Sequence, residues 1–209
     1  LVELRAREPL IDVILFRNGA FTTFNLVVFT AQFSKIAVFV FAALYLQNVV
    51  GFGALIAGVM ILFGTIPTVI SAYPTGIVLD RIGSRTLLLG AAGMAALAMF
   101  WMCFAVVRES YLLAVPALIV WGFCISVLFV PALRDVMMAV PAEKRGEAGG
   151  ISMTAQLLGG TVGMTICGAL IATTSNFVLV YLVTGALFVL LFVLIWVHVA
   201  PMRQTSGTD

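Results

Sequence analysis

The residues of this chain whose types and spacing could do chemistry are concentrated in one short polar segment, GIVLDRIGSR, residues 76–85. The segment places an aspartate, two arginines and two spaced glycines between long apolar runs. Gly76 precedes Asp80 by one helical turn, so the missing side chain and the carboxylate share a face that a neighbouring helix can approach closely. We expect Asp80 to accept hydrogen bonds from the N–H groups at the start of that neighbour, where the helix dipole favours negative charge.

The second half of the segment predicts a turn that carries exposed charges. Gly83 permits a tight reversal of the chain. Arg81 and Arg85 should stay at the level of lipid headgroups and pair with acids on adjacent links, for which Asp135 and Glu143 are the candidates. The same spacing also fits the alternative of an ordinary polar loop.

A second charged pair, Arg134 and Asp135, lies near the end of the fourth apolar run. Adjacent helical residues point to different sides, so the two side chains do not face each other. We expect Asp135 to lie against Arg81 or Arg85. Arg134 is expected to point toward the cytoplasmic mouth of the central cavity that the family resemblance given below implies. Ion pairs of this kind would hold an inner gate closed in one state and break in the other.

Polar residues within two apolar runs are candidates for lining that cavity. Asn25, Gln32 and Lys35 lie seven and three residues apart, which brings them to one helical face. Lys35 is too deep in its run to reach an interface, and a charge at the bilayer centre costs at least about 2.5 kcal/mol, so it should face protein or water. On the fourth run, Trp121 and Ser126 could line the same cavity, with plain packing as the alternative for Trp121.

Three roles are open for Lys35. It could pair with an acid outside this chain, attract an anionic or zwitterionic substrate, or titrate during transport. A purely structural lysine, held by backbone carbonyls, is the alternative.

Composition indicates what elements must position these residues. The chain has 63% hydrophobic and 10% charged residues, whereas soluble domains carry about 25% charged residues, so it belongs in a bilayer. The net charge of +2 gives no electrostatic footprint for nucleic acid. One histidine and three cysteines without metal-ligand spacing predict no metal site, no cofactor and no enzyme.

Six apolar runs are long enough to cross about 30 Å of hydrocarbon as helices. The expected spans are residues 20–46, 53–79, 86–107, 111–140, 147–173 and 177–200. Residues 1–19 form a charged amphipathic lead-in and residues 201–209 a tail. Because most arginines and lysines fall on the two termini and on the links 2–3 and 4–5, both termini are expected in the cytoplasm.

The pattern Gly-x-x-x-Asp-Arg-x-Gly-x-Arg at the end of the second span resembles the cytoplasmic loop signature of the major facilitator superfamily. Three further stretches resemble its fourteen-span drug:proton antiporters: PLIDVILFRNGAF, LYLQNVVGFGALIAG and VPAEKRGEAGGISMTAQLLGGTVGMTICGALI. Ser84 departs from the signature, which often has a basic residue there. The resemblance covers nearly the whole chain in order, and it implies an all-α integral membrane protein whose six transmembrane helices form the C-terminal half of a transporter.

The resemblance also implies partners and a mechanism. The first and fourth helices of each half line the cavity, and the second and fifth contact the other half, here a missing N-terminal half or a second copy. The Gly159-x-x-x-Gly163 spacing on the fifth span allows close helix contact, either static or moving. The implied function is proton-coupled export of amphipathic small molecules by a multi-pass protein of the plasma (inner) membrane. A selective carrier of an anionic metabolite, favoured by Lys35, and a non-transporting membrane subunit are the alternatives.

Overall fold

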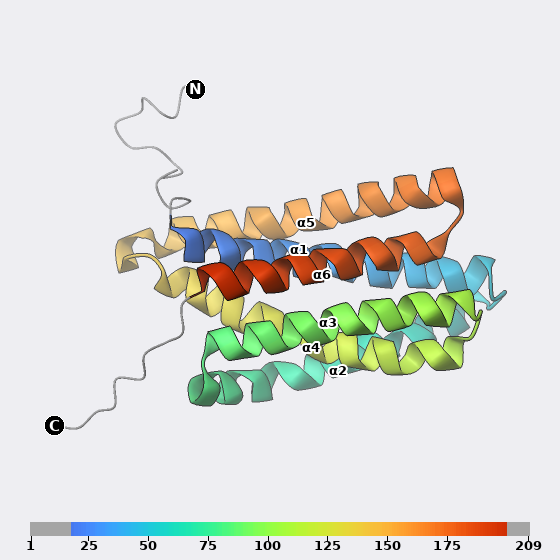
Figure 1. The fold of residues 1–209 in the computed structure, drawn as a ribbon, viewed down its shortest axis with the longest axis horizontal. Helices are drawn as coiled ribbons and strands as arrows, with labels where there is room; N and C mark the ends of the chain where they lie inside the picture. Colours follow the sequence, from blue (N-terminus) through green and yellow to red (C-terminus); the bar gives the residue numbers. More distant parts are fainter. Residues whose placement is uncertain (1–17, 200–209) are drawn as a thin grey trace.

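The structure is a computed structural model that describes residues 18–199, and within them it shows one bundle of six long α-helices (Figure 1). The helices are α1 (Gly19–Asn48), α2 (Ala54–Ile82), α3 (Ser84–Val107), α4 (Tyr111–Met138), α5 (Arg145–Thr174) and α6 (Phe177–His198), with a short 3-10 helix, η3 (Ala142–Lys144), before α5. All six helices are long and apolar enough to cross a membrane. The predicted fold class is confirmed, and the largest difference in the expected boundaries is that α2 continues past Leu79 to Ile82.

Local sequence explains where several helices begin and end. Asn18 caps α1 because its Oδ1 accepts a hydrogen bond from the N–H of Ala20 at 3.1 Å, and Asn176 caps α6 in the same way through the N–H of Val178 at 2.9 Å. Between α2 and α3 a single residue, Gly83, adopts φ 79°, which glycine reaches without steric cost. The tight reversal predicted at Gly83 is therefore confirmed.

The helices differ strongly in how much of their surface is covered. α1 packs against α4, α5 and α6, and α4 packs against α2 and α3, so these two helices lie in the middle of the bundle. Within their most apolar stretches, 56% of the α1 residues and 50% of the α4 residues are buried, compared with 22% for α2 and 17% for α5. In Figure 1, α5 and α2 lie at opposite edges of the bundle, where they expose the largest apolar surfaces.

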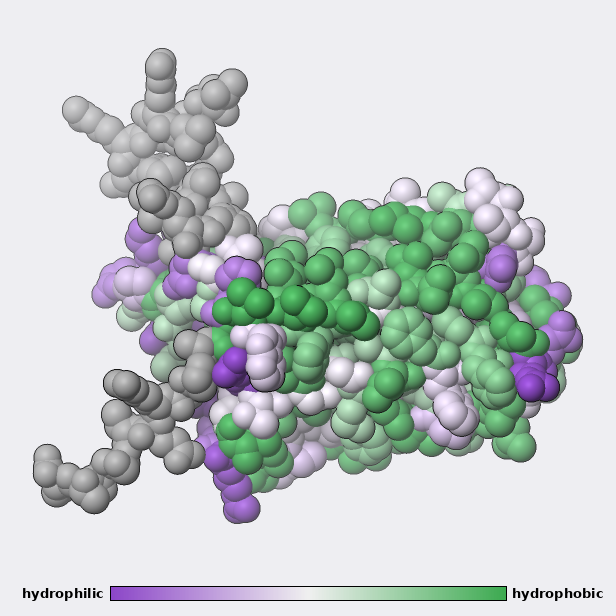
Figure 2. Space-filling view, in the orientation of Figure 1, coloured by the Kyte–Doolittle hydropathy of each residue, from purple (hydrophilic) through white to green (hydrophobic). Residues whose placement is uncertain are grey.

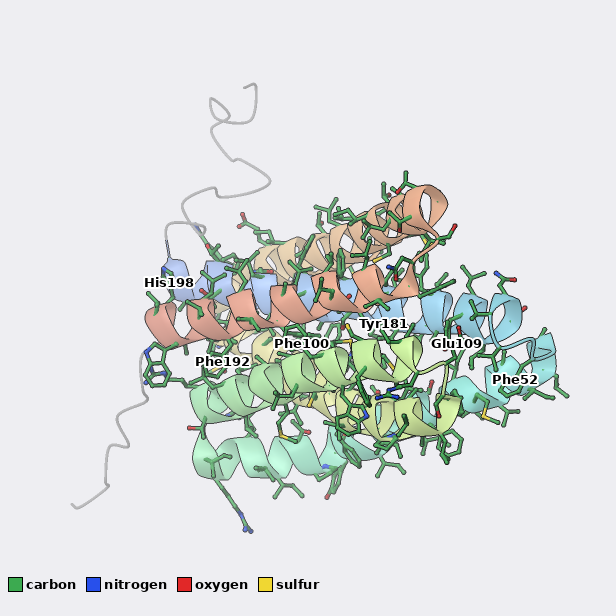
Figure 3. All side chains as sticks on the ribbon, turned by 45° about the vertical axis from the view of Figure 1, so that its right-hand side comes forward. Phe52, Phe100, Glu109, Tyr181, Phe192 and His198 are labelled. Atoms are coloured by element: carbon green, nitrogen blue, oxygen red, sulfur yellow. The ribbon has the colours of Figure 1, made fainter. Side chains whose placement is uncertain are left out.

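Apart from Lys35 in the middle of α1, the charged residues of the described part lie near the two ends of the bundle. The beginning of α1, the α2–α3 turn, the link from α4 to α5 and the end of α6 share one end, here called the termini end (Figure 1). His198 marks this end, whereas Glu109 and Phe52 lie at the opposite end (Figure 3). Figure 2 shows hydrophilic side chains at both ends and an apolar band between them, as a membrane-spanning protein requires. The predicted lead-in up to Arg17 and the tail from residue 201 lie outside the described residues.

Candidate functional site

An ion pair joins α2 and α4 at the termini end. Arg134 donates through Nη1 to Oδ1 of Asp80 at 2.7 Å, and the two side chains are 51% and 68% exposed. Exposed pairs of this kind contribute about 0–1 kcal/mol, so the contact can break and re-form at little cost in stability. The partner expected for Asp80 from the sequence was wrong. Asp80 pairs with Arg134 of α4 instead of the backbone N–H groups expected from the sequence, and both side chains line a cleft at this end of the bundle.

The predicted pairing of Asp135 with Arg81 or Arg85 is also wrong for the described residues, because no ion pair joins them. Asp135 is only 8% exposed and lines a cavity of about 340 Å³ together with Ser84 and Arg85. The Arg85 guanidinium instead donates from Nη2 to the backbone oxygen of Trp196 at 3.1 Å, and it lies 5.3 Å from the centre of that indole ring. The contact between α3 and α6 therefore holds Arg85 away from an ion pair.

Gly76 does not mark a close helix approach within this bundle. A β-carbon added there would meet no described atom within 4 Å. The neighbour expected at this position is therefore not one of the six helices described.

The polar side chains of α1 divide between two neighbours. Asn25 is buried, donates from Nδ2 to the Phe21 carbonyl at 3.0 Å and accepts at Oδ1 from Ser152 Oγ of α5 at 2.8 Å. Gln32 is partly buried and also lies against α5, since its Cγ is 3.6 Å from the position of a β-carbon on Gly160. Two of the three polar residues thus face α5.

Lys35 turns the other way, toward α4. Its Nζ lies 5.4 Å from the centre of the Phe129 ring, a cation–π arrangement, and the side chain is partly buried. It forms no ion pair with any residue in the described range 18–199. The single cluster expected from the spacing is therefore corrected: Asn25 and Gln32 contact α5, and Lys35 presents an ammonium beside α4 with no carboxylate to neutralise it.

The two candidates on α4 contribute to contacts inside the bundle. Trp121 is fully buried, donates from Nε1 to Ser34 Oγ at 3.3 Å and meets the Phe39 ring edge-on at 5.4 Å. Ser126 is buried too, and its hydroxyl donates to the Thr68 carbonyl at 2.9 Å. In this structure Trp121 follows the packing alternative, and both side chains are buried in contacts between helices.

Sequence analysis missed the crossing of α2 and α4. A β-carbon on Gly122 would collide with the Gly64 carbonyl oxygen, and Thr68 Oγ1 lies 3.0 Å from the carbonyl oxygens of both glycines. The signal that could have found this contact is a small residue four positions after each glycine, Thr68 after Gly64 and Ser126 after Gly122.

Gly159 and Gly163 lie at a helix interface, and the partner is α1 of the same bundle. A β-carbon at Gly159 would collide with the Phe29 carbonyl oxygen, and one at Gly163 would lie 3.1 Å from the carbonyl oxygen of Phe33. The two glycines therefore let the α5 backbone reach the α1 backbone. They do not face outward toward a second half.

Within residues 18–199, no group of three or more His, Cys, Asp or Glu side chains is placed to hold a metal ion. The cysteines of the described part, Cys103, Cys124 and Cys167, are all free thiols.

Comparison with known proteins places the chain among transporters. The family described as Major Facilitator Superfamily matches residues 26–208. The chain is 29% identical over 171 residues to a protein of Mycobacterium tuberculosis named Multidrug resistance protein Stp. The aligned residues make up 82% of this chain and 32% of that protein. It is 28% identical over 173 residues to the Tetracenomycin C resistance and export protein of Streptomyces glaucescens, covering 83% and 32%. It is 26% identical over 170 residues to the Methyl viologen resistance protein SmvA of Salmonella typhimurium, covering 81% and 34%. The chain spans about a third of the length of these relatives.

Proposed function

Since this chain belongs to the major facilitator superfamily, we propose that it is the six-helix C-terminal half of a secondary transporter that exports amphipathic small molecules in exchange for protons. The observation that carries the proposal is the match over residues 26–208 together with relatives named for drug resistance and export. The poorly covered, apolar α2 and α5 support a bundle that needs a partner, supplied by an N-terminal half or by a second copy.

The proposed mechanism is alternating access, in which two halves rock around a binding site near the bilayer midplane. At the termini end, the Asp80–Arg134 pair is the element that would differ between states, because an exposed pair costs little to break. By the positive-inside rule, we place this end in the cytoplasm and the protein in the plasma (inner) membrane. Asp80 and Arg134 would then hold the ends of α2 and α4 together while the cytoplasmic side is in one of its two states.

A second candidate is a selective carrier of an anionic metabolite. The observation in its favour is the Lys35 ammonium, partly buried near the middle of α1 and free of any ion pair with a described residue. A cation at this depth attracts negative charge, either from the substrate or from an acid of the other half. A non-transporting membrane subunit would show neither activity.

The proposal is tested by efflux of an amphipathic fluorescent cation from cells that lack their own exporters and express the full-length protein. Cells with the wild-type protein should lose dye faster than cells without it, and a protonophore should abolish the difference. The Asp80→Asn variant should lose efflux while its amount in the membrane is unchanged. Glu109→Gln, a matched acid-to-amide change at the opposite end, should keep efflux.

Wild-type efflux by Asp80→Asn would remove the proposed gating role of the ion pair. Efflux that survives the protonophore would exclude proton coupling. If the dye is retained but an organic anion is transported, the carrier of an anionic metabolite is the correct function.

A further inference from the structure

A cleft of about 790 Å³ opens at the termini end of the bundle, between the end of α2, the first half of α3 and the last turns of α6. Its mouth is lined by charged residues of α2, α3 and α4, and it continues along α3 toward the middle of the bundle over glycines and apolar side chains. Phe192 of α6 lies on the side of α6 that faces α3 (Figure 3). The cleft is separate from the α1, α4 and α5 side chains discussed above as candidates for substrate contact.

The mouth of the cleft carries positive charge that no ion pair with a described residue neutralises. Asp80 is neutralised by Arg134, whereas Arg81 is exposed and forms no ion pair with a described residue. Arg85 uses one N–H on the Trp196 carbonyl, and its buried Nε has no hydrogen-bond partner among the described residues. The exposed Arg81 guanidinium is therefore available to an anion, and Arg85 adds a second positive charge to the lining of the same cleft. Guanidinium groups match phosphate oxygens well.

The beginning of α3 adds donors at the same place. Gly83 precedes the helix and provides no side-chain cap, so the first N–H groups of α3 are not satisfied by a capping side chain. Ser84 is only 2% exposed and lines the cleft, and its hydroxyl is close enough to the Asp135 carboxylate to hydrogen-bond it. Helix N-termini with free donors bind phosphate, and here the flanking Arg81 and Arg85 add full charges.

The inner part of the cleft suits an apolar chain. At Gly90 an added β-carbon would meet nothing within 4 Å, so this position is an open trough, and Leu97 farther along α3 is exposed. Phe192 forms the opposite wall, with its ring 3.7 Å from the position of a β-carbon on Gly93. This side of α3 and α6 belongs to the apolar band of the surface (Figure 2), which lipid tails contact in a bilayer.

We infer that this cleft binds one anionic phospholipid from the leaflet at the termini end. Its phosphate would lie at the N-terminus of α3, near Arg81 and Arg85, and one acyl chain would follow the trough over Gly90. Basic pockets between transmembrane helices bind anionic lipid headgroups in this way. The buried Asp135 lies beside Ser84 and Arg85 in the adjoining cavity of about 340 Å³ and competes for them, so the selectivity is set mainly by Arg81. The inference holds whatever the protein transports.

The test is native mass spectrometry of the full-length protein released from micelles that contain equal amounts of phosphatidylglycerol and phosphatidylcholine with the same chains. We expect one phosphatidylglycerol to be retained in preference to phosphatidylcholine. Arg81→Gln should reduce this preference about fivefold, the effect of one basic residue at a lipid surface. Arg108→Gln is the matched control, because Arg108 lies at the opposite end, over the Phe104 ring. Neither exposed arginine supports the fold through an ion pair with a described residue, so both variants should remain folded.

A second variant tests the acyl chain. Gly90→Leu would place an apolar side chain in the trough, where an added β-carbon meets nothing within 4 Å, and it should lower the retention of phosphatidylglycerol. Glycerol phosphate, which has no acyl chain, should fail to displace the lipid. Equal retention of the two lipids, or equal effects of Arg81→Gln and Arg108→Gln, would overturn the inference. Displacement by glycerol phosphate would show a site for free phosphate instead. Failure here leaves the efflux experiment unaffected, because that experiment does not depend on the cleft.

Discussion

Replacing Gly159 with alanine tests the contact between α1 and α5, and the adjacent Gly160 provides a matched control. At Gly159 the new methyl group would collide with the backbone oxygen of Phe29, which cannot rotate away. At Gly160 the nearest atom is Cγ of Gln32 at 3.6 Å, an ordinary contact. Both changes remove a glycine from the middle of the same helix, so the gain in helix propensity, about 1 kcal/mol, is common to the two and cancels in the comparison.

What remains is the overpacking cost at Gly159, which is about 1–3 kcal/mol when a methylene is forced into a filled space. The assay is the free energy of unfolding of the full-length protein in mixed micelles with increasing denaturing detergent. Gly159→Ala should be less stable than Gly160→Ala by about that amount, while Gly160→Ala should match or exceed the wild type. If the two variants are equally stable, the α5 backbone does not contact α1 at Gly159 and the packing described for this helix is wrong.

Three further predictions concern α4 and Lys35. Gly122→Ala should lower the Tm of the full-length protein because its methyl would strike the α2 backbone, whereas Gly58→Ala, with nothing within 4 Å, should not; equal Tm values would contradict the α2–α4 crossing. Trp121→Phe removes the donor to Ser34, and this hydrogen bond should account for about 0.5–1.5 kcal/mol of the lost unfolding free energy, in addition to the cost of the void left by the smaller ring. In a double-mutant cycle with Ser34→Ala, additive effects would show that the hydrogen bond contributes nothing. Lys35→Met should reduce transport of anionic or zwitterionic substrates more than transport of cations. Parallel transport assays with both substrate classes test this, and an equal loss of rate for the two classes would refute it.

Much of the fold could be predicted because hydrophobic run length alone determines the number of membrane-spanning helices. The six runs correspond to the six helices, and Gly83 adopts the positive φ expected for a one-residue reversal. Each of these features depends on residues close together in sequence. They therefore needed no knowledge of how the helices pack.

Contacts between helices could be predicted only in part, because sequence spacing gives the face of one helix and not the neighbour that covers it. Asp80 was expected to accept hydrogen bonds from backbone N–H groups, yet the end of α4 lies beside the end of α2 and Arg134 donates to it. Gly159 was expected at a close helix contact, but only the structure shows that the partner is α1. The buried side chains of Trp121 and Ser126 show the same limit, since polar atoms in an apolar helix indicate a partner without identifying it.

The central claim is that this chain is half of a proton-coupled exporter, and transport by the purified full-length protein in proteoliposomes tests it most directly. An imposed pH gradient, with no other energy source, should drive an amphipathic cation across the membrane, and dissipating the gradient should stop it. The Asp80→Asn protein should behave like protein-free liposomes. No movement above protein-free liposomes under the gradient, or movement at the same rate with and without it, would contradict the account.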